Sequence, residues 1–164
     1  MPMLDAYIPA GALEPESEAQ LCSDLTDILI KGEGADPRNP AVRALAWVTV
    51  FRPETVYVAG EPAQAPRYRF TAAVPEGQWD ARRRARMIAK VTDAVLEAEG
   101  GRYDRDPSRV WVLTPEIPDG TWGGDGRVWT LADIVGVALG DAEAGRQYAE
   151  AVLAKRRGVA TATA

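Results

Sequence analysis

Histidine is absent from this 164-residue chain, and cysteine occurs once, at Cys22. Without histidine, Ser-His-Asp catalysis, Cys-His catalysis, His-ligated metals and the usual proton shuttle at physiological pH are excluded. A single cysteine excludes an intramolecular disulfide and a cysteine-based zinc site. The sequence therefore predicts no metal and no cofactor. Any acid–base chemistry must come from carboxylates, Tyr, Lys, Cys or the amino terminus.

Long hydrophobic runs and excess positive charge are also missing. No stretch approaches the roughly 18 apolar residues of a membrane-spanning helix. Lys and Arg total 19 against 24 Asp and Glu, a net charge of −5, which argues against a nucleic-acid-binding face. The arginines at 82–84 and 86 are expected on a solvated helix face. The amino terminus lacks a basic segment and carries Asp5, unlike a signal peptide, so we expect a cytoplasmic protein without membrane or nucleic-acid partners.

Hydrophobic residues make up 46% of the chain and charged residues 26%, which is typical of one globular domain at this length. Apolar periodicity and turn residues predict the elements of this domain. Strands are expected at 3–8, 44–52, 68–74 and 109–114, a hairpin arm at 56–60, and helices at 15–31, 80–98, 130–139 and 141–157. Cys22 falls on the apolar face of the first helix and is expected in the core.

The order of these elements repeats after about 66 residues. Gly11 and Gly77 each precede a helix, and Trp47 and Trp111 each lie on the strand that follows. Each unit is a β-α-β crossover, which normally joins parallel strands. The sequence thus predicts an α+β fold in which two tandem units, 2–60 and 67–127, form a four-stranded sheet with two helices on one face. We expect one domain over 1–140, a C-terminal helix and flexible tail over 141–164, and oligomerisation through the uncovered face.

Three runs, taken with the leading proline, resemble the tautomerase superfamily. ALEPESEAQLCSDLTDILIKGEG, from Ala12, resembles the first helix of the cis-3-chloroacrylic acid dehalogenase group, and RVWVLTPEIP resembles its last core strand. EIPDGTWGGDG resembles the segment of 4-oxalocrotonate tautomerase that carries an active-site aromatic, here Trp122. The resemblance covers about residues 2–127. It implies a homotrimer of fused units, in which Pro2 becomes the catalytic amino terminus after removal of Met1.

The proline has a simple chemical rationale. An α-amine titrates near pH 7.7–8.0, and a prolyl amine somewhat higher. An apolar pocket disfavours the ammonium form and lowers the pKa, which leaves a neutral base near the operating pH. Met3, Leu4 and Ile8 follow on the same strand. In a chain without histidine, Pro2 is the best candidate base.

The chain departs from the family at several positions. The segment AAVPEGQW has no arginine where fused members hold a carboxylate-binding pair. Leu29 stands at the position of a histidine in the dehalogenase group, Leu113 at that of its tyrosine, and Trp111 at an arginine position of the small tautomerases. Dehalogenase activity is therefore not expected.

Other residues are candidates for substrate binding. Arg109, Trp111 and Leu113 alternate onto one strand face, where Arg109 is the candidate anion contact. Arg127, Arg67 and Arg69 are alternatives for bidentate carboxylate binding. Trp122 is a candidate pocket wall, and Gln78, Tyr7 and Tyr57 are candidate hydrogen-bond donors to an enolate oxygen. Surface salt bridges and core packing remain the plainer interpretations of these residues.

Three functions stay open. The favoured one is a keto–enol tautomerase in which Pro2 moves a proton between oxygen and carbon of a small enol or keto acid. The second is a Pro2-dependent decarboxylase, hydratase or aldol-type enzyme that uses covalent chemistry on the amine. The third is a non-catalytic binding protein that keeps the fold, which the missing His, Tyr and Arg positions favour.

Overall fold

The computed structural model describes residues 3–162, and the side chains of residues 3–158. A mixed sheet lies at its centre, with strand order β2-β1-β5-β6 and with β7 paired to β5. These strands are β1 (Met3–Tyr7), β2 (Trp47–Phe51), β5 (Tyr68–Pro75), β6 (Val110–Leu113) and β7 (Glu116–Ile117). The β1–β2 and β5–β6 pairs are parallel, and β1–β5 is antiparallel.

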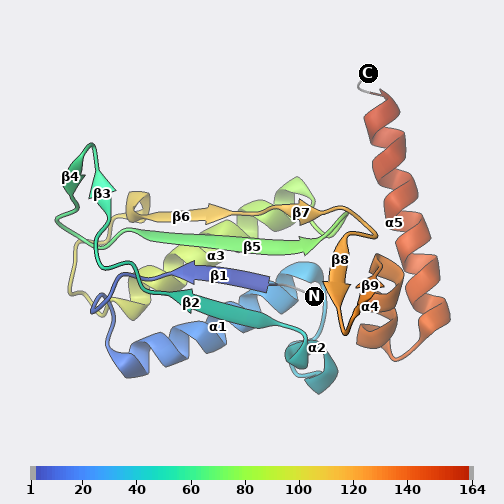
Figure 1. The fold of residues 1–164 in the computed structure, drawn as a ribbon, viewed down its shortest axis with the longest axis horizontal. Helices are drawn as coiled ribbons and strands as arrows, with labels where there is room; N and C mark the ends of the chain where they lie inside the picture. Colours follow the sequence, from blue (N-terminus) through green and yellow to red (C-terminus); the bar gives the residue numbers. More distant parts are fainter. Residues whose placement is uncertain (1–2, 163–164) are drawn as a thin grey trace.

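The two long helices, α1 (Pro15–Glu33) and α3 (Ala81–Ala98), pack on each other and lie together behind the sheet (Figure 1). α1 begins with Pro15 and has acids in its first turn, and it ends at Gly34 with φ +89°. Both features are typical of helix ends. α3 begins at Asp80, whose carboxylate accepts a hydrogen bond from the Arg83 N–H. Short sequence signals therefore fix where both helices start.

The remaining elements lie at the two ends of the sheet (Figure 1). They are α2 (Pro40–Ala44), the hairpin β3 (Tyr57–Val58) with β4 (Glu61–Pro62), the 3-10 turn Pro107–Arg109, the hairpin β8 (Trp122–Gly124) with β9 (Arg127–Trp129), α4 (Leu131–Leu139) and α5 (Ala142–Ala162). α4 and α5 pack on each other as a helical pair. They stand beyond the end of β7 and cover neither broad face of the sheet.

The core lies between the sheet and the two long helices, and it shows the expected spacing of 66. Leu21, Leu25 and Leu29 of α1 are fully buried, as are Met87, Val91 and Val95 of α3 at the same positions plus 66. The strands follow the same rule: Leu4, Ala6 and Ile8 are matched by Phe70, Ala72 and Val74. The two units therefore bury equivalent positions.

The opposite face of the sheet carries exposed apolar side chains at its two edges. Trp47, Phe51, Trp111 and Leu113 are between 39% and 69% exposed. Strand register places all four on one face, with Asp5, Thr49 and Thr71 between them. Several large exposed apolar side chains on one face are typical of an interaction surface.

The α+β class predicted from sequence is confirmed, and several details differ, among them α2 and β4, which were not predicted. The sheet has a fifth strand, β7, because Glu116 and Ile117 extend the pairing beyond β6. The segment around Trp122, expected as a loop, forms the β8–β9 hairpin. α5 continues to Ala162, into the segment expected as a flexible tail.

The two glycines of the repeat give a matched test of packing. Gly11 and Gly77 have φ of +72° and +83°, so alanine at either position is strained, by roughly 1–2 kcal/mol. A Cβ at Gly11 meets nothing within 4 Å, whereas one at Gly77 lies 2.3 Å from Val152 of α5. We expect Gly77→Ala to lower the free energy of unfolding clearly more than Gly11→Ala, measured by urea denaturation. Equal losses would contradict the packing of α5 against this turn.

Candidate functional site

A cavity of about 360 Å³ lies at the end of the molecule where β1 begins. Its lining includes Pro75, the last residue of β5, and Gln78 in the turn that follows. Met3 pairs with Ala73, two residues before Pro75, so the cavity adjoins the start of β1. The rest of the wall is largely apolar and comes from Val42, Leu45, Leu131, Ile134, Val135, Ala138 and Leu139.

Glu116 of β7 fixes the turn that carries Gln78. One of its carboxylate oxygens accepts hydrogen bonds from the N–H groups of Gly77 (3.0 Å) and Trp79 (3.1 Å). The other oxygen pairs with Arg84 of α3 at 3.6 Å and with Arg156 of α5. The fifth strand therefore helps to position Gln78, because Glu116 accepts hydrogen bonds from the backbone on both sides of this residue.

Gln78 is only 5% exposed and is one of the residues that line the cavity. Its side-chain oxygen lies 3.5 Å from the hydroxyl of Tyr148 on α5. Its Nε2 is buried without a hydrogen-bond partner among the described residues. A buried amide donor without a partner costs roughly 1–3 kcal/mol. Such a donor is suited to a ligand oxygen.

Three charged side chains also line the cavity, Glu33, Asp36 and Arg83, and sequence reasoning selected none of them. Glu33, at the end of α1, has its pKa raised by burial of the carboxyl. Arg83, in the first turn of α3, lines the same cavity near Gly34 and is 3.8 Å from Asp80. The spacing of 66 that relates Glu33 to the buried Glu99 was a usable signal. Arg83 was expected on a solvated face.

Pro2, the candidate base, lies outside the described residues. The residue that follows it, Met3, begins β1.

Of the predicted binding residues, only Gln78 lines this cavity. Trp111 of β6 pairs with Arg69, which pairs with Tyr7 at the far end of β1, and Arg109 lies just before β6. Four residue steps along β1 span about 13 Å. Within one chain, Arg109 and Trp111 therefore lie near the Tyr7 end of β1, away from its Met3 end.

Arg109 is also already paired. It is 3% exposed, and both guanidinium nitrogens bind Glu99 at 2.5 Å. Glu99 further accepts a hydrogen bond from the Tyr68 hydroxyl at 2.9 Å, and burial followed by this bond raises the pKa of Tyr68. Strand alternation predicted a shared face with Trp111, but the 3-10 turn at Pro107–Arg109 interrupts the pleat before β6 begins.

The other predicted residues have local roles. Trp122 is 8% exposed and pairs with Trp129 in the β8–β9 hairpin, and it does not line the cavity. Arg127 lies over the Trp129 ring at 4.2 Å and pairs with Asp133 at 3.5 Å. Leu113 is exposed on the open sheet face.

Two features are absent from the described residues. No cluster of three or more His, Cys, Asp or Glu side chains that could hold a metal ion occurs in residues 3–162. In the same part of the chain, no helix combines the length and apolar character needed to cross a membrane.

Comparison with solved structures identifies the fold. Pt0534, in a crystal structure inactivated by 2-oxo-3-pentynoate, has a TM-score of 0.63 and 21% identity over 77% of this chain and 94% of that chain. A fused 4-OT described as a symmetric trimer has a TM-score of 0.62 and 22% identity over 78% and 94%. N1, a member of the cis-3-chloroacrylic acid dehalogenase family, has a TM-score of 0.63 and 20% identity over 77% and 82%.

At these identities the similarity establishes the fold alone. No protein-family model matches the chain, and no curated protein matches it in sequence. The resemblance to the tautomerase superfamily is confirmed at the level of structure: the chain has the fold of fused tautomerase-superfamily proteins.

Proposed function

We propose that this protein is a tautomerase-like enzyme in which Pro2, exposed by removal of Met1, acts as general base and general acid on a small enol or keto acid. The neutral amine removes the enol proton from oxygen, and the resulting ammonium returns a proton to carbon. The product is the keto tautomer, and no atoms are gained or lost.

The observation that carries this proposal is the cavity at the start of β1. Its wall is mainly aliphatic, from α2, α4 and the residues beside them. Such surroundings disfavour an ammonium ion and lower the pKa of an amine. A base near neutrality is thereby available in a chain without histidine.

The polar lining matches the needs of the substrate. Arg83 supplies a guanidinium for the carboxylate, in place of the arginine pair that the sequence lacks after β5. The free Nε2 donor of Gln78 is suited to the developing enolate oxygen. Glu33 places a carboxyl with a raised pKa beside them. With one arginine in the cavity, we propose a substrate that carries a single carboxylate.

The uncovered sheet face supports an oligomer. Trp47, Phe51, Trp111 and Leu113 form an apolar surface, and the similar fused 4-OT is described as a trimer. We propose a homotrimer in which this face is covered by neighbouring copies.

Two other functions use the same fold. A decarboxylase, hydratase or aldol-type enzyme would form a covalent iminium on Pro2 or activate water through Glu33. A non-catalytic binding protein would keep the cavity without turnover. Glu33 and Arg83 line the same cavity, and a carboxyl and a guanidinium together favour an enzyme over a binding protein.

Proton NMR in D2O distinguishes these functions. With an aryl 2-keto acid such as phenylpyruvate, we expect deuterium to enter the carbon next to the carbonyl faster than in protein-free buffer, with the carbon skeleton intact. Loss of CO2 or addition of water would show the second function instead. Exchange at the protein-free rate, across several 2-keto acids, would contradict the tautomerase proposal.

A further inference from the structure

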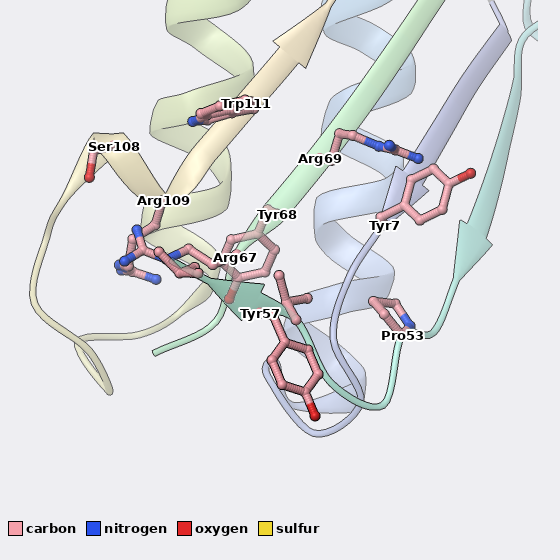
Figure 2. Close-up of a pocket in the computed structure, with 11 residues that line it drawn as sticks. Tyr7, Pro53, Tyr57, Arg67, Tyr68, Arg69, Ser108, Arg109 and Trp111 are labelled. Atoms are coloured by element: carbon pink, nitrogen blue, oxygen red, sulfur yellow. The ribbon is translucent and has the colours of Figure 1, made fainter. Parts of the chain in front are cut away.

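A second cavity, of about 520 Å³, lies at the opposite end of β1, where β5 begins. Figure 2 shows its lining, which includes Arg67, Arg69 and Arg109 together with Tyr7, Tyr57 and Trp111. Arg67 extends toward Arg109, and Arg69 extends toward Tyr7. The three guanidinium groups therefore border one space that also has aromatic walls.

The charge in this cavity is only partly compensated. None of the lining residues carries a carboxylate, and Glu99 pairs with Arg109 alone. Within the part of the chain that the structure describes, neither Arg67 nor Arg69 forms an ion pair within 4 Å. Two positive charges thus remain in a protein whose net charge is −5.

Of the three arginines, Arg67 has the least complete set of hydrogen bonds. Its Nε is buried and has no hydrogen-bond partner among the described residues. Asp106 has its pKa lowered by hydrogen bonds from Ser108 and, less strongly, by the charges of Arg67 and Arg109, but it forms no ion pair with Arg67. Arg69 is held over the Tyr7 ring at 4.0 Å. Arg67 is half-buried and Arg69 is exposed, and guanidinium groups without a carboxylate partner bind carboxylates through charge-assisted hydrogen bonds.

The rest of the lining is apolar and aromatic. Tyr57 is 65% exposed and Trp111 is 69% exposed. Pro53, Val56 and Val58 also line the cavity. Large exposed aromatics around a concave surface are typical of a site for a flat apolar group.

The position of this cavity follows from the repeat. β1 and β5 run antiparallel, and positions 66 apart share their burial, so the start of β5 is the second unit's counterpart of the start of β1. Tyr68 stands 66 residues after Pro2, and Glu99 stands 66 after Glu33. Here the carboxylate is held by Tyr68 and Arg109, and no amine base is present.

We propose that the second unit carries a non-catalytic binding site for an aromatic carboxylate. The carboxylate binds Arg67, with Arg69 adding positive charge, and the flat apolar body lies against Tyr57 and Trp111. The site binds without turnover because its only buried acid is neutralised and its base position is a tyrosine. This proposal does not require turnover at Pro2. Trp111 lies on the sheet face that the proposed trimer covers, so in the assembly a neighbouring copy would bound the site on that side.

Isothermal titration with cinnamate tests it, using the Arg83→Ala variant so that the first cavity lacks its guanidinium. We expect one binding event per chain, weakened about 10- to 100-fold in Arg67→Gln, because a charge-assisted hydrogen bond is lost. The neutral amide of cinnamate should bind far more weakly than cinnamate. Arg38→Gln, which removes a fully solvated arginine paired with Asp36, is the matched control and should bind normally.

Three results would overturn the proposal. They are cinnamate affinity unchanged within twofold in both Arg67→Gln and Arg69→Gln, equal affinity for the amide, or loss of all binding in Arg83→Ala. The last would place cinnamate in the first cavity or in one shared with it. Circular dichroism of each variant establishes that the fold is kept, and Trp111→Leu gives a second variant that alters the wall without touching charge.

Discussion

Pro2→Ala is expected to reduce tautomerase turnover by about 10²- to 10⁴-fold, the range that general acid–base catalysis contributes. Alanine leaves an amino terminus, but the amine is primary and lacks the proline ring. The reaction loses its secondary amine while the cavity lining at Gln78, Arg83 and Glu33 is unchanged. Initial rates with phenylpyruvate, followed by ultraviolet absorbance of the enol, measure the effect.

The control for Pro2→Ala is a measurement of its fold and its oligomeric state. Pro2→Ala changes none of the buried core residues of the described structure. The fold and the trimer should therefore persist, as measured by circular dichroism and light scattering. Pro62→Ala, at an exposed position of β4, should keep full turnover. Turnover retained in Pro2→Ala would remove the proline from the mechanism, and a monomeric parent protein would contradict the proposed assembly.

Arg109→Ala is expected to lower the free energy of unfolding by about 3–5 kcal/mol, because it leaves Glu99 buried without its cation. Both side chains are nearly inaccessible, at 3% and 1% exposure, and Tyr68 shares the same carboxylate. Urea denaturation measures the loss. Arg105→Ala, which breaks an exposed pair with Asp93 at 3.3 Å, should cost less than about 1 kcal/mol.

The stability of Arg109→Ala distinguishes a structural role for Arg109 from the substrate-binding role predicted from the sequence. Sequence alternation suggested that Arg109 grips the substrate carboxylate. If Arg109→Ala is as stable as Arg105→Ala but loses affinity for keto acids, the ligand role is correct. If Arg109→Met with Glu99→Leu restores much of the stability lost in Arg109→Ala, the pair is a replaceable part of the core.

Much of the fold could be predicted from the sequence because its signals are local. The helix over 15–31 needed only Pro15, an apolar stripe and a glycine stop, and the structure extends it by two residues to Glu33. The repeat of 66 placed the second helix and strand. The fifth strand was missed because Glu116 and Ile117 form only two pairs with β5, too few to leave a periodic signal.

The site was harder to predict because its residues meet only in the folded chain. Gln78 was selected for its place after Gly77, and the structure puts it in the cavity. Arg83 sits among four arginines of similar appearance in sequence, and nothing local marks it as the one that lines the cavity. Trp122 was expected at a pocket because it is flanked by glycines, but the hairpin buries it against its own neighbours.

The proposed mechanism requires a mature chain that begins at a neutral, accessible Pro2. Intact mass spectrometry before and after treatment with 3-bromopropiolate measures both properties. We expect a starting mass that lacks Met1, followed by a single covalent adduct that peptide mapping assigns to Pro2. A mature chain that retains Met1, so that the proline nitrogen is an amide, would contradict it.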